Sequence, residues 1–218
     1  MSGHLTALFG GTFDPIHYGH LLPSMALAKE INLTHISLLP NYIPPHKAQP
    51  KATTAQRLAM IKLAIEDYPL FSIDVREITH AKPNRPSYTI DTLQNWRSEY
   101  GEHKSLAFII GQDSLCNLPK WYHWQSLLDY CHLLICPRPG FTNTTDNLQL
   151  QKWLLQHSTK NITDLQQNPC GSIYFANTPL KAISATEIRQ HIENRQDYQS
   201  LLPPKVWQYI QTQHLYGA

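Results

Sequence analysis

The fold is decided by the stretch Leu5-Thr-Ala-Leu-Phe-Gly-Gly-Thr-Phe-Asp-Pro-Ile-His-Tyr-Gly-His20. In this stretch an apolar run leads into a glycine turn, and a helix begins after the turn. The apolar run, residues 5–9, ends at two glycines, as a buried strand does. Those glycines let the backbone turn sharply and approach a ligand closely. Pro15 ends the strand pattern, and we expect a helix to begin near Tyr18. The stretch therefore predicts a strand, a tight turn and a helix.

The same alternation continues along the rest of the chain. Further strands are expected at 35–39, 71–78, 106–110, 132–135 and 172–176. Segments of helical period lie between the strands, at 21–31, 55–68, 88–100 and 124–131. Alternation of this kind predicts a Rossmann-like α/β fold, with a parallel sheet and helices on both faces. Ligands then bind beyond the carboxyl ends of the strands, where strand order reverses.

Three regions depart from this alternation. Residues 41–54 form a loop rich in Pro and Lys, and residues 141–167 read as a polar surface insertion with one amphipathic patch around 153–155. From Ser184 the chain is helical, and Pro203-Pro204 suits the start of a final helix. We therefore expect one domain over 1–218, with a helical C-terminal extension from about 184. The sequence indicates no role for 141–167.

The composition is that of an ordinary globular protein. Of the 218 residues 42% are hydrophobic and 16% are charged, and a net charge of +2 does not favour nucleic acid or a membrane surface. The four cysteines form no CxxC pair and no zinc spacing, which favours reduced thiols. No stretch approaches the roughly 20 apolar residues of a membrane span, and the first residues lack a signal-peptide pattern. A cytoplasmic location is expected.

Two histidines follow the glycine turn. His17 and His20 are three positions apart, so their rings point the same way on the first helical turn. A helix N-terminus favours phosphate, and imidazoles beside it can stabilise charge that develops during phosphate transfer. A glycine turn with two hydrogen-bonded histidines explains the pair as well. Zinc is a weaker alternative, since no third ligand is nearby in the sequence.

The whole string from Gly10 to His20 resembles the GxFDPxHxGH signature of the nucleotidylyltransferase superfamily, whose HxGH element is related to the HIGH motif of class I aminoacyl-tRNA synthetases. A second string, Ile183-Ser-Ala-Thr-Glu-Ile-Arg189, is similar to the superfamily's ISSTxIR element, with Ala185 in place of the second serine. Ser184 and Glu187 have capping-box spacing, which alone explains a helix start. The resemblance implies that this helix binds the β- and γ-phosphates of ATP and that Arg189 neutralises the departing pyrophosphate.

Within the superfamily the sequence resembles the bacterial nicotinate-nucleotide adenylyltransferases over nearly its entire length. The segments that carry this resemblance are Asn41-Tyr-Ile-Pro-Pro-His-Lys47, Pro86-Ser-Tyr-Thr89, Phe108-Ile-Ile-Gly-Gln-Asp-Ser114, Trp121-Tyr122 and Arg138-Pro-Gly140. Phosphopantetheine adenylyltransferases and cytidylyltransferases share the first motif, but they are shorter and are not expected to match these segments.

The resemblance implies roles for individual residues. Trp121 stacks on the pyridine ring, the backbone near Thr89 and Tyr122 recognises the nicotinate carboxylate, and Asp113 lies near a ribose. The residues implied for ATP are Gly10, Gly11, Thr12, Phe13, His17, His20, Gly111, Asp113, Ile183, Ser184, Thr186 and Arg189. Those implied for the acceptor are Asn41, His46, Lys47, Tyr88, Thr89, Trp121, Tyr122 and Arg138, with His46 and Lys47 beside its phosphate.

Simpler explanations of some of these residues remain open. Trp121 and Trp124 could form a surface aromatic pair. Asp113 is also a favoured helix N-cap, and a lysine in a proline-rich loop is usually just solvated.

The implied reaction converts ATP and nicotinate mononucleotide to nicotinate adenine dinucleotide and pyrophosphate, a step of NAD biosynthesis, with Mg²⁺ on the triphosphate. His17, His20 and Arg189 are the expected catalytic residues, and no nucleophilic residue is needed. Nicotinamide mononucleotide or another small phosphorylated acceptor is the alternative substrate. A nucleotide-binding regulator without catalysis is disfavoured because both histidines and the arginine are present. The sequence indicates neither the oligomeric state nor the preference for acid over amide.

Overall fold

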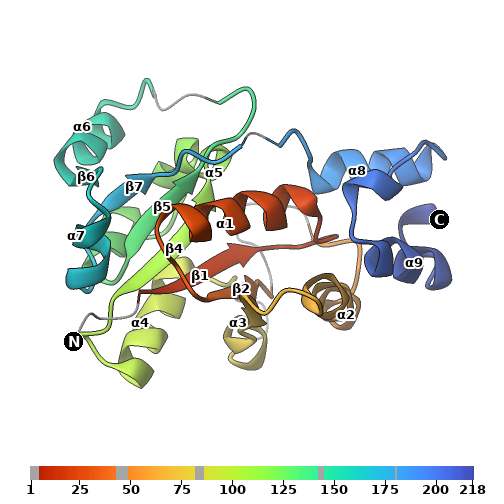
Figure 1. Cartoon of the computed structure of the whole chain (residues 1–218), viewed down its shortest axis with the longest axis horizontal. Coiled ribbons are helices and arrows are strands. Elements are labelled where there is room, and N and C mark those ends of the chain that lie inside the picture. Colours follow the sequence, from red (N-terminus) through yellow and green to blue (C-terminus); the bar gives the residue numbers. More distant parts are fainter. Residues whose placement is uncertain (1–4, 43–48, 82–85, 142–144, 180) are drawn as a thin grey trace.

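The computed structural model describes residues 5–42, 49–81, 86–141, 145–179 and 181–218. Within them seven parallel strands form one sheet in the order β3-β2-β1-β4-β5-β7-β6 (Figure 1). The strands are β1 (Thr6–Gly11), β2 (Ile36–Pro40), β3 (Phe71–Ile73), β4 (Leu106–Gly111), β5 (His132–Cys136), β6 (Ser158–Thr159) and β7 (Ile173–Phe175). The predicted Rossmann-like α/β fold is confirmed.

Helices connect the strands. The α-helices are α1 (Tyr18–Glu30), α2 (Thr54–Ile65), α3 (Arg76–Thr79), α4 (Thr89–Tyr100), α5 (Gln112–Cys116), α6 (Leu148–His157), α7 (Ile162–Gln167), α8 (Ala185–Glu193) and α9 (Pro204–Thr212). Short 3₁₀ helices occur at η1 (Leu118–Lys120), η2 (Trp124–Asp129), η3 (Gln199–Leu201) and η4 (Leu215–Gly217). Among the described residues, no helix combines the length and apolarity needed to cross a membrane.

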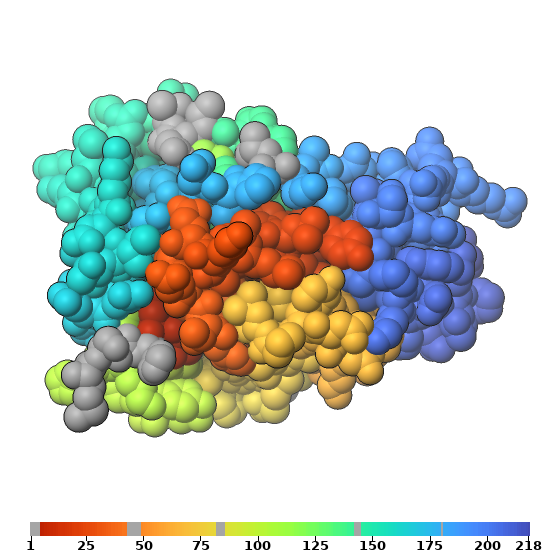
Figure 2. Space-filling model, in the orientation of Figure 1, coloured from red at the N-terminus to blue at the C-terminus, as the bar shows by residue number. Residues whose placement is uncertain are grey.

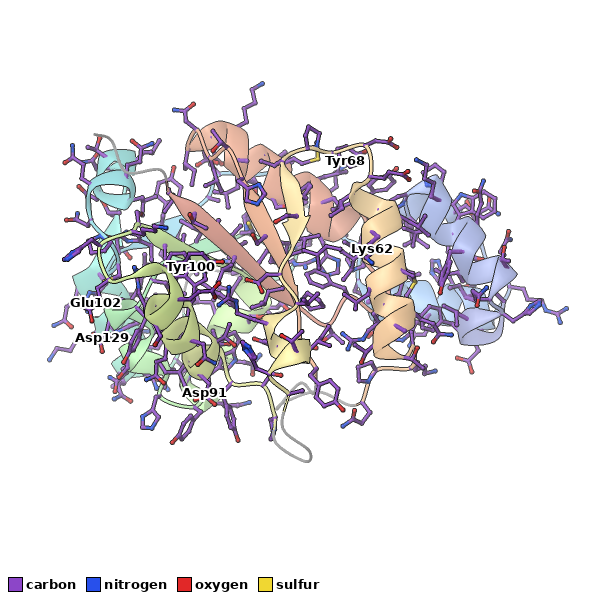
Figure 3. The ribbon with its side chains drawn as sticks, turned by 90° about the horizontal axis from the view of Figure 1, so that it is seen from below. Lys62, Tyr68, Asp91, Tyr100, Glu102 and Asp129 are labelled. Atoms are coloured by element: carbon purple, nitrogen blue, oxygen red, sulfur yellow. The ribbon has the colours of Figure 1, made fainter. Side chains whose placement is uncertain are left out.

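The strands are apolar on both sides because helices cover both faces of the sheet. Alternate side chains such as Phe9, Leu38 and Ile109 pack in one core with residues of α1, α2, α8 and α9. Their neighbours, such as Leu8 and Phe108, pack in a second core with residues of α4, α6 and η2. Figure 3 shows α4 lying over the second face. This period-two division explains why continuous apolar runs, rather than alternating ones, mark the buried strands.

Strand order reverses between β1 and β4. From β1 the chain builds outward through β2 to β3, then returns to place β4 on the other side of β1. Both strands end in glycine, at Gly11 and Gly111. A reversal of this kind leaves a crevice beyond the carboxyl ends of the two strands, where ligands bind in open α/β sheets.

The C-terminal helices lie at the end of the molecule toward which β1 points (Figure 1). Helix α9 packs against α2, and Figure 2 shows the C-terminal residues as a continuous mass beside α1 and α2. Their apolar faces share the first core, with Ile188 of α8 and Ile210 of α9 fully buried. The predicted helical extension and the start of its last helix at Pro204 are confirmed.

Three local predictions are corrected by the structure. The segment 71–78 is a strand only as far as Ile73, because Asp74 accepts hydrogen bonds from the backbone and side chain of Arg76 and so starts α3. The segment 124–131 is the 3₁₀ helix η2 rather than an α-helix. The polar segment 141–167 is more than a surface insertion. It supplies the edge strand β6, which pairs with β7, and it buries Leu150 and Trp153 in the second core.

Candidate active site

Two adjoining hollows open at the carboxyl ends of β1 and β4. The larger hollow has a volume of about 750 Å³ and the smaller one of about 330 Å³. They share the backbone turn after β1 and the start of α5, and the residues common to both linings are Gly10, Gly11, Thr12, Gly111, Asp113 and Ser114. A molecule bound in one hollow can therefore contact a molecule bound in the other at the point of strand reversal.

The larger hollow gathers all twelve residues predicted for ATP. They come from the end of β1 and the turn after it, the start of α1, the end of β4 with the start of α5, and the segment that opens α8. Gly19 explains how the two motifs meet: a Cβ at this position would lie 2.7 Å from the Ile183 carbonyl oxygen and 2.8 Å from His17 Nδ1. Only glycine allows this approach, which places the start of α8 against the start of α1.

His17 and His20 lie side by side, as their spacing predicts, with ring centroids 3.8 Å apart. His17 is the N-cap residue of α1, and its backbone N–H donates to His20 Nδ1 over 3.4 Å. The His17 ring is 1% exposed, and its Nδ1 has no hydrogen-bond partner. A buried imidazole nitrogen without a partner is costly, which indicates that this ring is arranged for a group that enters the hollow.

The His17 ring is neutral near neutral pH. Burial, and secondly the positive charge of Arg138, lower its pKa to about 3. A neutral imidazole can donate one hydrogen bond to a phosphate oxygen without repelling the arginine beside it. The approach of an anionic phosphate would raise this pKa again, so the site can tighten as negative charge arrives.

The start of α8 forms the opposite wall of the larger hollow. Ser184 is the N-cap, and its Oγ accepts a hydrogen bond from the Glu187 backbone N–H over 3.1 Å. Arg189, one turn into the helix, donates to the Thr186 hydroxyl over 3.2 Å and to the Asp14 carbonyl oxygen over 2.6 Å. The helix N-terminus and the guanidinium thus present positive potential to the hollow.

Arg57 is a buried support that sequence reasoning missed. It is 1% exposed and donates through Nη1 to the Thr12 carbonyl and through Nη2 to the Asn41 carbonyl, each over 2.8 Å. Asn41 in turn donates to the Thr12 hydroxyl over 3.3 Å. Arg57, a residue of α2, therefore ties Thr12 after β1 to Asn41 after β2, and both of these residues line the smaller hollow. The sequence offered one signal for this role, because Arg57 lies on the otherwise apolar face of α2.

The smaller hollow is aromatic at its rim. Trp121, Tyr122, Tyr88 and Thr89 line it as predicted, together with Asn41. The rings of Tyr88 and Tyr122 lie 5.0 Å apart, and Tyr122 is 51% exposed. Thr89 is the first residue of α4, so the helix N-terminus, which favours a carboxylate or other anion, lies at this hollow.

The surface-pair explanation of Trp121 and Trp124 is wrong for Trp124. This indole is buried, and its ring packs edge-on against Trp153 with centroids 5.0 Å apart. Trp121 is the member of the pair that reaches the smaller hollow.

Glu77 also lines the smaller hollow, and the sequence analysis did not identify it. It accepts a 2.7 Å hydrogen bond from the Thr92 hydroxyl, and Ser87 also bonds to it. Burial raises the pKa of this carboxyl above its ordinary value, partly offset by those two hydrogen bonds. Glu77 thereby fixes the segment that opens α4. Glu77 could not be singled out as a site residue from the sequence, because it lies in the stretch 71–78, which was expected to be a strand.

Four predicted residues remain to be placed: Arg138, Asp113, His46 and Lys47. Arg138 lines the larger hollow, not the smaller one: its Nη1 donates to the Ile183 carbonyl over 3.2 Å and its Nε is 3.7 Å from Asp113 Oδ1. Asp113 lies in the first turn of α5, whose N-cap is Gly111, so the helix-cap explanation of Asp113 is wrong. His46 and Lys47 lie outside the described residues.

Comparison with known proteins now identifies the family. The cytidylyltransferase-like family matches residues 8–191. The probable nicotinate-nucleotide adenylyltransferase of Yersinia pestis (strain Pestoides F) is 53% identical over 212 residues, which cover 97% of this chain and 95% of the relative. The corresponding protein of Pectobacterium atrosepticum is also 53% identical over 212 residues, 97% of this chain and 98% of that protein. The chain belongs to the nicotinate-nucleotide adenylyltransferase family.

Solved structures of more distant sequence share the fold of this chain. A Plasmodium falciparum nicotinic acid mononucleotide adenylyltransferase complexed with APC has a TM-score of 0.71 at 18% identity, and the match covers 98% of this chain and 97% of that one. The same enzyme complexed with NaAD also has a TM-score of 0.71, at 20% identity over 97% of both chains. At these identities the likeness shows the fold.

Proposed function

We propose that this chain transfers the adenylyl group of ATP to nicotinate mononucleotide and so forms nicotinate adenine dinucleotide and pyrophosphate. One observation carries the proposal: two hollows of different chemistry meet at the turn after β1. The larger hollow holds both phosphate-binding motifs, and the smaller one offers an aromatic rim and a helix N-terminus. The family's 53% identical members support the same reaction.

The smaller hollow suits the acceptor. Trp121 offers a flat indole face to an electron-poor pyridine ring. The N-terminus of α4 at Thr89 supplies positive potential for the nicotinate carboxylate, which the amide of nicotinamide mononucleotide lacks. The acceptor's phosphate then points to the shared turn at Gly10–Thr12, where it meets the α-phosphate of ATP.

The larger hollow suits the triphosphate. An oxygen of the acceptor phosphate attacks the α-phosphorus of ATP and forms the new P–O bond. The bond from that phosphorus to the bridging oxygen breaks, and the electron pair leaves with pyrophosphate. His17 and His20 donate hydrogen bonds to oxygens that gain charge, while Arg189 neutralises the leaving group. Positioning and neutralisation of charge suffice for a transfer of this type, so no covalent intermediate is needed.

Mg²⁺ enters, in this proposal, as part of the ATP substrate. Phosphate oxygens are the hard ligands that Mg²⁺ prefers. Within the described residues no group of three or more His, Cys, Asp and Glu side chains could hold a metal ion. When bound, the ion supplies further neutralisation of the phosphates.

We further propose that residues 1–218 act as one domain and that the enzyme works in the cytoplasm. One core runs from the central strands to α9, which supports a single domain. Cys131 and Cys136 are buried free thiols, and burial raises the pKa of the Cys136 thiol to about 12. Inert reduced thiols of this kind support an intracellular setting.

Pyrophosphate release tests the proposed reaction. The purified protein is given ATP and Mg²⁺ with nicotinate mononucleotide, nicotinamide mononucleotide or phosphopantetheine, and the products are separated by chromatography. Release with the first acceptor, together with the dinucleotide, supports the proposal. Faster release with either of the others would reject the proposed acceptor. If a protein that still binds ATP released no pyrophosphate with any of the three acceptors, a nucleotide-binding regulator would be favoured.

A further inference from the structure

The C-terminal turn reaches back to the first motif through one side chain. Tyr216 lies in η4, and its hydroxyl donates a 2.7 Å hydrogen bond to Asp14 Oδ1, 202 positions earlier in the chain. The backbone of Tyr216 has φ 61° and ψ 14°, the left-handed region that side chains other than glycine rarely adopt. Such a conformation persists only where surrounding contacts hold it, so the tyrosine is fixed in this place.

The Asp14 carboxylate is the centre of this contact. It is 4% exposed and lies in the GTFDP string, where Asp14 lines the larger hollow. Besides Tyr216, its Oδ1 accepts from the Ala52 backbone N–H over 3.1 Å, and its Oδ2 accepts from the Lys51 N–H over 2.8 Å. Three neutral donors from two distant segments therefore engage the two oxygens of this buried carboxylate.

Arg189 lies against the same aspartate but does not bond tightly to its carboxylate. Arg189 Nη1 donates over 2.6 Å to the backbone carbonyl of Asp14, whereas the carboxylate Oδ2 is 3.8 Å away. The Arg189 side chain is 21% exposed and lines the larger hollow. A carboxylate this close would normally draw a guanidinium into a bidentate pair.

We propose that Tyr216 is a positioning residue for Arg189, acting through Asp14. Its hydroxyl engages Oδ1, so the carboxylate competes less for the guanidinium and Arg189 keeps its charge turned to the triphosphate. Loss of the hydroxyl leaves Oδ1 with one donor and lets Arg189 close onto Asp14. This inference rests on the proposed function in one respect, namely that the larger hollow binds ATP.

The test compares Tyr216→Phe with Tyr198→Phe. Tyr198 belongs to the same C-terminal region and is 8% exposed. Its hydroxyl is hydrogen-bonded to Gln211 and not to Asp14. Each variant loses one hydroxyl hydrogen bond, so a purely structural effect is matched. We measure ATP binding by calorimetry without acceptor, then KM for ATP, KM for nicotinate mononucleotide, and kcat.

Tyr216→Phe is expected to weaken ATP binding and lower kcat/KM for ATP by roughly tenfold, the effect of about one hydrogen bond to a charged group. The KM for nicotinate mononucleotide stays as in the parent protein, and Tyr198→Phe matches the parent in every constant. Equal constants in the two variants would overturn the inference, as would a Tyr216→Phe loss confined to the acceptor's KM.

The two proposals fail in different ways. A parent protein that binds ATP but releases no pyrophosphate contradicts the proposed function, while the calorimetric comparison still decides the role of Tyr216. A parent protein that binds no ATP overturns both.

Discussion

The larger and smaller hollows differ in how the chain builds them. The larger hollow is made mainly from two contiguous strings, 10–20 and 183–189, each of which follows the C-terminal end of a strand and opens a helix. The smaller hollow is assembled from single residues of several separate segments, among them Glu77, Tyr88 and Trp121. Phosphate recognition needs consecutive backbone N–H groups and so leaves a continuous motif, whereas shape recognition of a ring does not.

The hollows also differ in the kind of interaction they offer. Around the larger one stand a buried neutral histidine, a helix N-terminus and the guanidinium of Arg189. Around the smaller one stand aromatic rings and the raised-pKa carboxyl of Glu77. Variants of the first hollow should therefore alter the chemical step for every acceptor, and variants of the second should alter which acceptor is used.

The largest effect is expected at His20. His20→Ala should lower turnover by about 10²–10³-fold with nicotinate and nicotinamide mononucleotide alike, because one preformed donor to developing charge is lost. Steady-state kinetics with each acceptor measure the effect. His35→Ala is the control, since His35 is hydrogen-bonded to the Ser72 hydroxyl and lies in neither hollow's lining. A folded His20→Ala protein with full activity would show that the ring does not act on phosphate.

Trp121 is the matching test on the acceptor side. Trp121→Ala should raise KM for nicotinate mononucleotide by about tenfold, because a stacked aromatic pair contributes on the order of 1 kcal/mol. The KM for ATP should not change, and Trp121→Phe should recover much of the loss. If the KM for ATP rises instead, the two hollows do not divide the substrates as described.

The buried histidine predicts how stability depends on pH. His17 has a folded pKa of about 3, below the ordinary 6.5, so below pH 6.5 the unfolded chain binds a proton that the folded chain does not. Stability is therefore lost as the pH falls through the unfolded pKa, by about 1.3 kcal/mol between pH 7.5 and 5.5 from this group alone.

Urea unfolding of the parent protein and of His17→Ala at the two pH values measures this contribution. The drop in unfolding free energy should be about 1.3 kcal/mol smaller in the variant. His132, whose pKa burial also lowers, remains in both proteins and cancels in the comparison. An identical drop in both proteins would mean that the His17 ring is not buried in its neutral form.

The smallest effect separates a helix cap from a phosphate site. Ser184→Ala should cost about 1 kcal/mol of stability, the typical value of an N-cap. Asn147→Ala removes the corresponding cap of α6, where the side chain accepts from the Leu150 N–H over 2.9 Å, and should cost a similar amount. Thermal unfolding checks both losses. Only Ser184→Ala should also weaken ATP binding. Equal ATP affinities in the two variants would mean that Ser184 acts as a helix cap and does not bind phosphate.

Most of the sheet was predictable from the sequence because its strands are buried on both faces and so read as apolar runs. The same reasoning placed β1, the turn after it and the start of α1 correctly. It failed at 71–78, where an alternating pattern continues past the last sheet hydrogen bonds and Asp74 ends the strand. It failed again at 141–167, because the polarity of the segment as a whole hid the helical spacing of Leu150, Trp153 and Leu154, which are buried in the second core.

The candidate site divides in the same way. All the residues of the two motifs that were predicted for ATP line the larger hollow, since each string is local in sequence. The hydrogen-bond partners of Arg57 and Tyr216 could not be predicted, because Thr12, Asn41 and Asp14 are brought to them only by the fold. Contacts between residues far apart in the chain leave no periodicity or fixed spacing in the sequence.

A crystal structure with nicotinate adenine dinucleotide bound is the most direct test of the division between the two hollows. The pyridine ring should lie on Trp121 with its carboxylate at the start of α4, and the diphosphate should lie at the turn 10–12. The adenosine half should then occupy the larger hollow beside His17 and His20. A dinucleotide bound in the opposite direction, with adenine on Trp121, or bound outside both hollows, would contradict the account.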